Sequence, residues 1–354
     1  MSKQSSNYTK QLILNDIAYL FDDIITKPLT ELNLENDFEI NTIQFCKNWL
    51  SNLQEFSINT SGSTGKPKTI RLTRNQMIKS AEMTAETFNL QKGDSILINL
   101  NTTYIAGIMM LVRGFHLDLK MTIIEASSNP LEKIRNKYFN FFAFVPLQLQ
   151  TIIENNKSDL LQKAKAIIVG GVPISPYQEK LFIKLNLPVF STYGMTETCT
   201  HIAIRKVGKS SFNALINVEL SIDERNCLII KSPTSIENKL ITNDVVDLLS
   251  SSEFIWKGRI DNIINSGGIK IQVEELESKI SNLLLNIKCQ TKFIITSKSD
   301  SKLGDKIVLV SEEKLNESFL KDNLSPFEYP KEFLIIDKFP ETETGKINRN
   351  KLPI

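Results

Sequence analysis

Residues 60–68 hold the residue types that can wrap a polyphosphate. They read Thr-Ser-Gly-Ser-Thr-Gly-Lys-Pro-Lys, so hydroxyl groups, two glycines and two lysines lie within nine positions. Small residues let backbone N–H groups approach phosphate oxygens, and lysine supplies positive charge. The spacing excludes a Walker A loop, which needs four residues between its glycines and a Ser or Thr directly after its lysine. A solvent-exposed turn between strands is the alternative interpretation.

A second candidate segment, residues 191–198, comes at the end of a short apolar run. Ligands collect at the carboxyl ends of strands in open parallel sheets. The ring of Tyr193, next to Gly194, can stack on a purine, and the carboxylate of Glu197 can hold a magnesium ion. An ordinary strand-to-loop transition is the alternative.

Three later segments carry polar groups that are weaker signals when taken singly. Asp244, expected at a strand end, can accept hydrogen bonds from ribose hydroxyls, and the guanidinium of Arg259 can hold a sugar or phosphate. The paired glycines of residues 265–268 permit close backbone approach to a ligand. Lys346, near residue 354, is ordinarily a solvated charge.

The elements that must position these residues follow an α/β pattern. Residues 74–88 are predicted to form a helix, because Thr73 and Gln76 have capping-box spacing and apolar residues recur on one face. Strands and helices alternate, which predicts a mostly parallel sheet flanked by helices. The short apolar runs expected as its strands are 95–100, 121–125, 141–145, 166–169 and 188–193.

After residue 193 the pattern predicts an antiparallel subdomain and then a small α+β domain. Short strand-like runs follow one another without helices, at 201–207, 217–222, 227–231 and 253–256. From about residue 258 a hairpin, two helices and three more strands are expected. The predicted domains are therefore 1–258 and 259–354, joined by a short hinge.

Composition narrows the class of protein. The 354 residues carry 42 Lys+Arg against 40 Asp+Glu, a net charge of +2, which does not favour a nucleic-acid partner. Four scattered cysteines without a C-x-x-C pair argue against zinc or disulfide frameworks. The polar N-terminus and the short apolar runs predict a cytoplasmic protein without a membrane span. Glycine is scarce, 14 residues or about 4%, against an average near 7%.

In this order the segments resemble the acyl-adenylate-forming superfamily, which includes acyl- and aryl-CoA synthetases, luciferases and peptide-synthetase adenylation domains. Residues 60–68 match its phosphate loop at every fixed position, and residues 193–197 match its Tyr-Gly-x-Thr-Glu pattern. Asp244 matches its ribose-binding aspartate, and Gly170-Gly171 matches the glycine pair before the adenine pocket. Residues 258–261 match its Gly-Arg-x-Asp hinge, 266–268 its Ser-Gly-Gly loop and 345–346 its catalytic Gly-Lys pair. The resemblance also implies that the large domain is trimmed before Thr60.

Within the superfamily, three stretches are similar to the o-succinylbenzoate–CoA ligases of menaquinone biosynthesis. They are residues 104–113, 193–199 and 242–246. Thr-Asn-Asp at 242–244 departs from the general Thr-Gly-Asp pattern but suits this subgroup.

The resemblance implies a site for ATP, Mg²⁺ and coenzyme A, in which a carboxylic acid is adenylated and then transferred to CoA. Lys346 would bridge the attacking carboxylate and the α-phosphate, Thr196 would hold that phosphate, and Glu197 would bind magnesium. Asp261 would be the pivot of a mobile small domain. The other cofactor-binding residues implied are Thr60, Ser61, Gly62, Ser63, Thr64, Gly65, Lys68, Gly170, Gly171, Tyr193, Gly194, Asp244, Arg259, Ser266, Gly267 and Gly268.

The acyl pocket is expected between residues 104–113 and 198–201, which include Tyr104 and Gly107. Arg113 or His201 could pair with the second carboxylate of a dicarboxylic acid, although His201 is equally well explained as a strand residue satisfied by the backbone. Cys199 fits packing better than nucleophilic chemistry.

Two alternatives stay open at this point. The enzyme could act on another acyl or aryl acid, or the chain could be a non-catalytic nucleotide-binding scaffold. The combination of Lys346, Glu197 and the phosphate loop argues against a scaffold. Homo-oligomerisation is left open.

Overall fold

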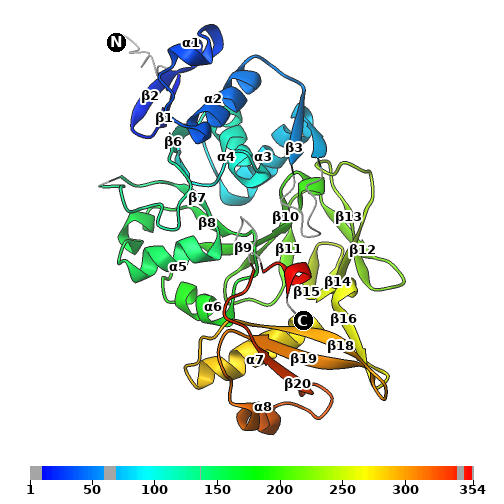
Figure 1. The fold of residues 1–354 in the computed structure, drawn as a ribbon. Helices are drawn as coiled ribbons and strands as arrows, with labels where there is room; N and C mark the ends of the chain where they lie inside the picture. The colour runs from blue at the N-terminus through cyan, green and yellow to red at the C-terminus, as the bar shows by residue number, and fades with distance from the viewer. Residues whose placement is uncertain (1–9, 60–68, 136, 341–346, 353–354) are drawn as a thin grey trace.

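One long sheet organises residues 10–259 of the computed structural model, which describes residues 10–59, 69–135, 137–340 and 347–352 (Figure 1). Within the described residues it contains thirteen strands, and its two halves differ in direction. In order across the sheet the strands are β2 (Ile17–Leu20), β1 (Gln11–Leu14), β6 (Lys120–Ile123), β5 (Ser95–Ile98), β7 (Phe141–Phe144), β8 (Ala166–Val169), β9 (Val189–Gly194), β10 (His201–Lys206), β11 (Phe212–Ala214), β15 (Glu253–Arg259), β14 (Leu240–Ser250), β13 (Cys227–Lys231) and β12 (Glu219–Ile222).

Six neighbouring strands of this sheet, in the order β1, β6, β5, β7, β8 and β9, are parallel to one another. Their side chains alternate between two apolar layers: Ile96 and Ile98 face one layer, and Leu97 faces the other. The helices that cover these faces, with the short helices nearby, are α1 (Phe21–Thr26), η1 (Leu29–Glu31), α2 (Asp37–Leu50), α3 (Arg74–Phe88), α4 (Ile105–His116), α5 (Pro146–Glu154), η2 (Ser158–Leu161) and α6 (Pro176–Ile183).

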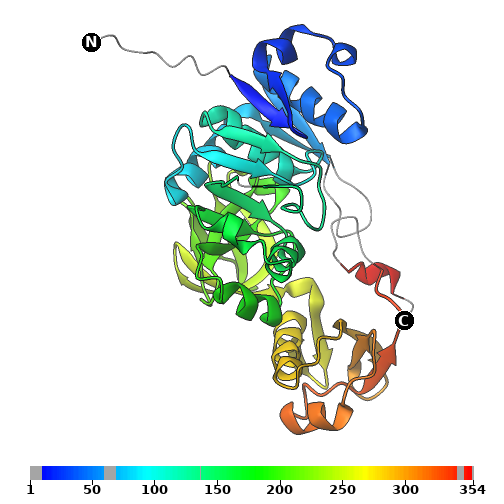
Figure 2. The same ribbon diagram turned by 90° about the vertical axis from the view of Figure 1, so that its left-hand side faces the viewer.

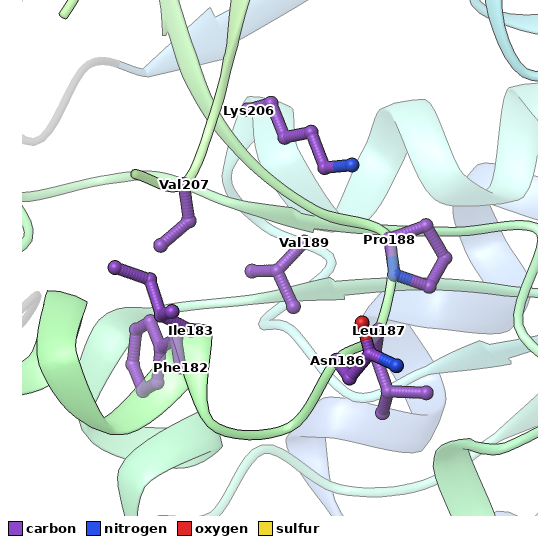
Figure 3. A pocket seen from close by; sticks show the side chains of 8 residues that line it. All are labelled: Phe182, Ile183, Asn186, Leu187, Pro188, Val189, Lys206 and Val207. Atoms are coloured by element: carbon purple, nitrogen blue, oxygen red, sulfur yellow. The ribbon is translucent and has the colours of Figure 1, made fainter. Parts of the chain in front are cut away.

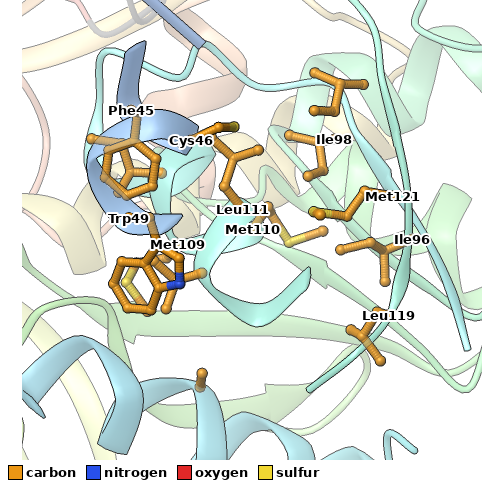
Figure 4. Packing of buried hydrophobic residues seen from close by; sticks show 14 of the residues in the cluster. Phe45, Cys46, Trp49, Ile96, Ile98, Met109, Met110, Leu111, Leu119 and Met121 are labelled. Atoms are coloured by element: carbon orange, nitrogen blue, oxygen red, sulfur yellow. The ribbon is translucent and has the colours of Figure 1, made fainter. Parts of the chain in front are cut away.

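The larger apolar layer holds α2, α3 and α4 against the sheet. In Figure 4, Met110 and Leu111 of α4 lie between Phe45 and Trp49 of α2 on one side and the strand residues Ile96 and Ile98 on the other. Burying a side chain of this size contributes about 1.5–3 kcal/mol. In the other layer α5 and α6 pack on residues such as Phe142. This sandwich fixes where the parallel strands end.

From β10 onwards the strands are antiparallel and continue the same sheet. β9 pairs in parallel with β8 on one side and antiparallel with β10 on the other. The predicted fold class is therefore confirmed, and the antiparallel part is joined to the parallel part strand by strand. The expectation that residues 242–244 end a strand is wrong: they lie inside the eleven-residue β14, just before an irregular register at Val245–Val246.

Residues 10–59 build the part that the sequence left without a prediction. The hairpin of β1 and β2 adds to the edge of the sheet beside β6, and α2 packs near α4. β3 (Glu55–Asn59) and β4 (Thr69–Thr73) form a separate two-stranded ribbon, paired from Glu55 with Thr73 to Asn59 with Thr69. The described ends on either side of residues 60–68 thus lie side by side.

The small sheet lies at the end of the molecule opposite the β1–β2 hairpin, as Figure 2 shows. β19 is paired with β18 on one side and with β16 and β20 on the other, so β18 is an edge strand. Its elements are η4 (Ile260–Asn262), β16 (Ile263–Ser266), β17 (Ile269–Gln272), α7 (Val273–Asn286), β18 (Phe293–Asp300), β19 (Gly304–Ser311), α8 (Glu317–Asn323), β20 (Glu332–Ile335) and η5 (Arg349–Lys351).

Many of the left-handed backbone positions in this glycine-poor chain are occupied by asparagine. Left-handed backbone suits glycine best, and asparagine is the next best tolerated residue. Asn89, for example, ends α3 with a φ of 50°. The described asparagines with positive φ are Asn15, Asn33, Asn52, Asn89, Asn156, Asn186, Asn217 and Asn226.

Among the described helices, none has both the length and the apolar character needed to span a membrane.

The predicted capping box at the start of α3 is confirmed. The Thr73 hydroxyl accepts from Gln76 N–H at 3.2 Å, and the Gln76 side chain accepts from Thr73 N–H at 2.9 Å. We expect Thr73→Ala to lower the free energy of unfolding by about 1 kcal/mol, because it removes an N-cap acceptor. Chemical denaturation measures this change.

Thr87→Ala is the matched control for that prediction. Thr87 is an exposed residue of the same helix, and its hydroxyl only donates back to Met83 O at 2.8 Å. Its removal should change stability by no more than about 0.5 kcal/mol. Equal losses in the two variants would contradict a capping role.

Candidate active site

The carboxyl end of β9 carries the Tyr-Gly-Met-Thr-Glu segment. Tyr193 and Gly194 are the last two residues of β9. Thr196 and Glu197 lie on the short turn η3 (Thr196–Thr198) that follows the strand. A Cβ on Gly194 would collide with the backbone of Thr200 and His201, so a side chain does not fit here. The turn is held by Thr198, whose hydroxyl accepts from Met195 N–H at 3.1 Å.

The glycine pair lies beside this segment. Gly170 and Gly171 follow β8, the parallel neighbour of β9, and Gly170 N–H donates to Phe144 O at 3.1 Å. A Cβ on Gly170 would collide with the hydroxyl of Thr192. Two of the predicted segments therefore meet at adjacent strand ends, where parallel sheets place ligands.

Asp244 is the centre of a buried polar cluster. Its Oδ2 accepts from Tyr193 Oη at 2.7 Å and its Oδ1 from Trp256 Nε1 at 3.2 Å. Arg259 Nη1 lies 4.0 Å from Oδ1, because β14 and β15 pair Asp244 directly opposite Arg259. Asp244 is 7% exposed. A carboxylate has about four acceptor positions, so two remain for ligand hydroxyls.

The ring of Tyr193 is held edge-on by two phenylalanines. Its centroid lies 5.1 Å from that of Phe254 and 6.0 Å from that of Phe212. Burial and the nearby Asp244 raise the pKa of Tyr193 well above its usual value. The phenol therefore stays protonated and donates to Asp244, which fixes the ring at the end of β9.

Asp261, the predicted pivot, is tied to the long sheet by polar contacts. Arg259 Nη2 donates to its Oδ2 at 2.7 Å, and Asn243 Nδ2 donates to both oxygens at 3.2–3.3 Å. The hydrogen bond from Arg259, aided by Asn243, lowers the pKa of Asp261. Arg225 Nη1 in turn donates to Asn243 Oδ1 at 3.4 Å.

The Ser-Gly-Gly segment forms the tip of the β16–β17 hairpin. Ser266 pairs with Ile269, so Gly267 and Gly268 are the two turn residues, with φ of 59° and 80°. Both values are left-handed, as the tightest hairpin turn requires, and this geometry alone explains both glycines. Gly267 N–H also donates to Leu303 O at 2.8 Å.

Arg113 and His201 meet in a second buried cluster. Arg113 Nε donates to Thr84 Oγ1 at 3.2 Å, and His201 Nε2 lies 3.5 Å from the same oxygen. Arg113 is 1% exposed, and its Nη2 has no hydrogen-bond partner among the described residues. None of the described acidic side chains forms an ion pair with it. Burial lowers the pKa of Arg113 to about 10, so it stays charged at neutral pH.

Cys199 closes this cluster on the side of β9. Its Sγ lies 3.4 Å from Met109 Sδ, and burial raises the pKa of the thiol to about 12. The thiol is therefore not activated as a nucleophile. Cys199 has a φ of 64°, and the hydrogen bond from Thr200 N–H to Thr198 O at 2.7 Å closes a strained three-residue turn around it.

Tyr104 and Gly107 are not part of the Arg113 cluster. They lie at the start of α4, and nine residues of helix put Tyr104 roughly 13 Å from Arg113. Gly107 is buried where a Cβ would collide with the carbonyl of Asn101. The four residues predicted for the acyl pocket thus occupy two places.

Two groups of predicted residues fall outside the described part of the chain. They are the phosphate-loop residues Thr60, Ser61, Gly62, Ser63, Thr64, Gly65 and Lys68, and the catalytic Lys346.

Sequence reasoning missed three residues that complete the site. Trp256 contacts Asp244, Asn243 contacts Asp261, and Thr84 lies between Arg113 and His201. The position of Trp256 within a strand, two residues before Gly258, could have signalled its role, since an indole N–H needs a partner when buried. Thr84 carries no sequence signal, because it is one of several small residues on the apolar face of α3.

A surface hollow of about 300 Å³ lies away from these clusters (Figure 3). It is at the amino end of β9, whereas Tyr193 is near the carboxyl end, and the strand separates Val189 from Tyr193 by roughly 13 Å. The hollow is therefore distinct from the predicted site. It is lined by Phe182, Ile183, Asn186, Leu187, Pro188, Val189, Lys206 and Val207.

Comparison with known proteins matches this arrangement to one family. The family model described as AMP-binding enzyme matches residues 56–224. The chain is 34% identical to an acyl-CoA synthetase (AMP-forming)/AMP-acid ligase II-like protein from Dyadobacter fermentans, covering 90% of this chain and 94% of that one, with a TM-score of 0.62. The chain belongs to the AMP-binding enzyme family.

Other relatives of this AMP-binding enzyme agree. It is 25% identical to a 2-succinylbenzoate–CoA ligase from Listeria innocua, over 97% of this chain and 78% of the relative. A Staphylococcus aureus protein of the same name is also 25% identical, over 96% and 77%. The Bacillus subtilis o-succinylbenzoate coenzyme A synthetase (MenE), solved with ATP and magnesium, shares the fold at 22% identity, with a TM-score of 0.72 over 84% and 69%. The prediction of an AMP-forming acid–CoA ligase is confirmed.

The buried His201 predicts a pH-dependent stability. Burial, reinforced by Arg113, lowers its pKa well below the ordinary 6.5, so the folded enzyme keeps it neutral while the unfolded chain protonates it. The unfolded state therefore binds more protons below about pH 6.5, and the free energy of unfolding falls there by up to about 1.4 kcal/mol per pH unit. Denaturation of the wild type and His201→Gln between pH 5 and pH 8 measures the difference.

His116→Gln is the control, since His116 is the other histidine of the chain and is partly exposed beside Glu82. The difference due to His201 should persist in that variant. An unchanged slope in His201→Gln would contradict a neutral buried imidazole.

Proposed function

We propose that the enzyme joins o-succinylbenzoate to coenzyme A, through an acyl-adenylate, with release of pyrophosphate and AMP. In the first step a carboxylate oxygen attacks the α-phosphorus of ATP and pyrophosphate leaves. In the second step the CoA thiolate attacks the acyl carbonyl and AMP leaves. The names of the relatives in Listeria and Staphylococcus support this acid.

The nucleoside would bind where β8, β9 and β14 converge. Asp244 keeps two acceptor positions for the ribose hydroxyls, and Arg259 stands next to it to hold ribose or phosphate. Tyr193 would pack against the adenine. Gly170 and Gly171, after β8, would leave room for the base because they carry no side chain. The hydrogen bonds that already fix Asp244 would pre-organise it for this task.

Magnesium would be held mainly by the nucleotide. The described residues contain no group of three or more His, Cys, Asp or Glu that could hold a metal. Mg²⁺ commonly binds one or two carboxylates together with substrate phosphates, so Glu197 on η3 suffices as the protein ligand. When bound, the ion would neutralise charge on the pyrophosphate leaving group. The phosphate loop would hold the β- and γ-phosphates, with Thr196 at the α-phosphate.

The buried cation at Arg113 is the observation that carries the choice of a dicarboxylic acid. A charged group without a carboxylate partner is costly in the interior, and the distal carboxylate of the substrate would provide the missing partner at Nη2. Met110, whose Sδ lies 3.7 Å from Nη1, is a flexible side chain that can move aside for it. The neutral His201 adds a hydrogen bond without adding charge.

We propose two domains, 1–258 and 259–354, that change their relative orientation between the half-reactions. The short η4 and the exposed polar contacts of Asp261 support a pivot there, since hinges absorb motion in a few residues. The β16–β17 turn at Ser266–Gly268 would line the passage for the CoA arm. A coupled pyrophosphate assay with o-succinylbenzoate, ATP, magnesium and CoA tests the whole reaction.

Arg113→Met should separate substrate recognition from stability. We expect kcat/KM for o-succinylbenzoate to fall about 10- to 150-fold, the value of a lost charged hydrogen bond. The activity with benzoate, should benzoate be a substrate, should change far less. Unfolding free energy should stay level or rise, because an unpaired buried charge is removed.

Arg113→Lys is the matched control, since it keeps the charge but not the planar fork. An equal loss for mono- and dicarboxylic acids in Arg113→Met would exclude the proposed contact. Turnover with another acid, and none with o-succinylbenzoate in the wild type, would exclude the substrate but keep the reaction. Failure with every acid would favour a nucleotide-binding scaffold.

Lys346→Ala should abolish adenylate formation and largely spare the second half-reaction. The lysine would stabilise charge on the attacking carboxylate and the α-phosphate, and that charge develops only in the first step. Pyrophosphate exchange measures the first step, and thioester formation from supplied acyl-adenylate measures the second. Equal loss of both steps would contradict this division.

A further inference from the structure

Arg349 forms a partly buried ion pair that reaches from the C-terminal segment to α7. Its Nη2 lies 2.7 Å from Glu277 Oε1, and its Nη1 donates to Ile295 O at 2.7 Å. The same Glu277 oxygen accepts from Ile295 N–H at 2.7 Å. Burial raises the pKa of Glu277, and Arg349 opposes that rise. Three short hydrogen bonds thus join α7, β18 and η5.

The pair takes the place of a neighbouring strand. β18 is the edge of the small sheet, and edge strands leave backbone groups without a partner. The two outward groups of Ile295 are satisfied by the two halves of one ion pair. The geometry of the strand therefore sets where Arg349 sits, to within the tolerance of hydrogen bonds.

The residues next to Arg349 are fixed to the same sheet. Ile347 and Leu352 pack against the apolar cluster of Ile294, Val308, Val310 and Phe339. Asn348 N–H donates to Pro340 O at 2.7 Å, which draws together the described residues on either side of 341–346. The apolar contacts allow sliding, whereas the ion pair and this hydrogen bond have direction.

We propose that Glu277 and Arg349 are positioning residues for the adenylation step, which fix the chain directly after Lys346, residues 347–352, on the small sheet. The proposal rests on the proposed function, because it takes Lys346 as the catalytic lysine. Arg349 follows Lys346 by three residues, so the chain can separate their Cα atoms by no more than about 11 Å. The position of Arg349 therefore limits where the lysine can lie.

The pair suits positioning better than stabilisation. Removing one partner of this partly buried pair leaves the other without its ion pair, whereas replacing both by apolar residues leaves no unpaired charge. The double variant Glu277→Leu/Arg349→Met should consequently fold, but it has no directional tie to Ile295. It tests position without the complication of unfolding.

The experiment compares the two half-reactions in Arg349→Met, Arg349→Lys and the double variant. We expect pyrophosphate exchange to fall about 100-fold in Arg349→Met and in the double variant, the scale of a misplacement of about 1 Å. Thioester formation from supplied acyl-adenylate should stay within about threefold of the wild type, and Arg349→Lys should recover part of the exchange rate. The KM for ATP should not change, because neither residue contacts the nucleotide.

Glu332→Gln is the matched control. Glu332 pairs with Lys298 at 2.7 Å and with Lys306 at 2.7 Å within the same sheet, but it does not contact η5. Its loss should leave both half-reactions unchanged. Equal loss of both steps in the Arg349 variants, or full retention of exchange, would overturn the proposal.

Hydrogen exchange provides a readout that does not need activity. The amide of Asn348 should exchange at least tenfold faster in the double variant, while amides in the centre of β19 keep their protection. Unchanged protection at Asn348 would overturn the positioning role even if the wild type acts on no tested acid. Inactive wild type with faster exchange at Asn348 would instead overturn the proposed function and keep the anchor.

Discussion

The double pairing of β9 is the constraint on which the rest of the site depends. This strand is parallel to β8 and antiparallel to β10, so the parallel and antiparallel halves of the sheet meet at its two edges. A parallel strand ends in a loop at the ligand-binding edge, and an antiparallel partner must turn back directly beside it. Gly194 is where both demands meet, because any side chain there would collide with β10. The turn that follows carries Glu197, and the strand itself aims Tyr193 at Asp244.

The two buried polar clusters use electrostatics in opposite ways. Around Asp244 the hydrogen bonds from Tyr193 and Trp256 fix the carboxylate and leave it two acceptor positions, while the pair of Glu277 with Arg349 is closed by the backbone of Ile295. Around Arg113 the match is incomplete among the described residues. Paired polar groups keep their side chains in place, whereas an unpaired buried cation can still bind an anion. The two clusters therefore differ in what they offer a ligand, which is hydrogen-bond acceptors held in place at Asp244 and an unpaired positive charge at Arg113.

Local patterns were predicted well because short-range physics determines them. The capping box at Thr73 and the short apolar runs of β5, β7 and β8 depend on neighbours in sequence. The contacts between residues of the candidate site were harder to predict from the sequence. The proximity of Asp244 to Arg259 follows from the hairpin register, but the contact of Trp256 with Asp244 and the meeting of Arg113 with His201 at Thr84 depend on three-dimensional packing. The position of residues 242–244 was wrong because a strand that continues through an irregular register has no local stop signal.

The unbroken sheet has a consequence for how the protein unfolds. Hydrogen bonding runs without interruption from β2 at one edge to β12 at the other, so the parallel and antiparallel halves have no seam at which one could melt and leave the other folded. The small sheet has its own apolar clusters, and the chain passes to it from the long sheet through the short turn η4. Calorimetry should accordingly resolve at most two cooperative units, with the division at the hinge and not at the point where strand direction reverses.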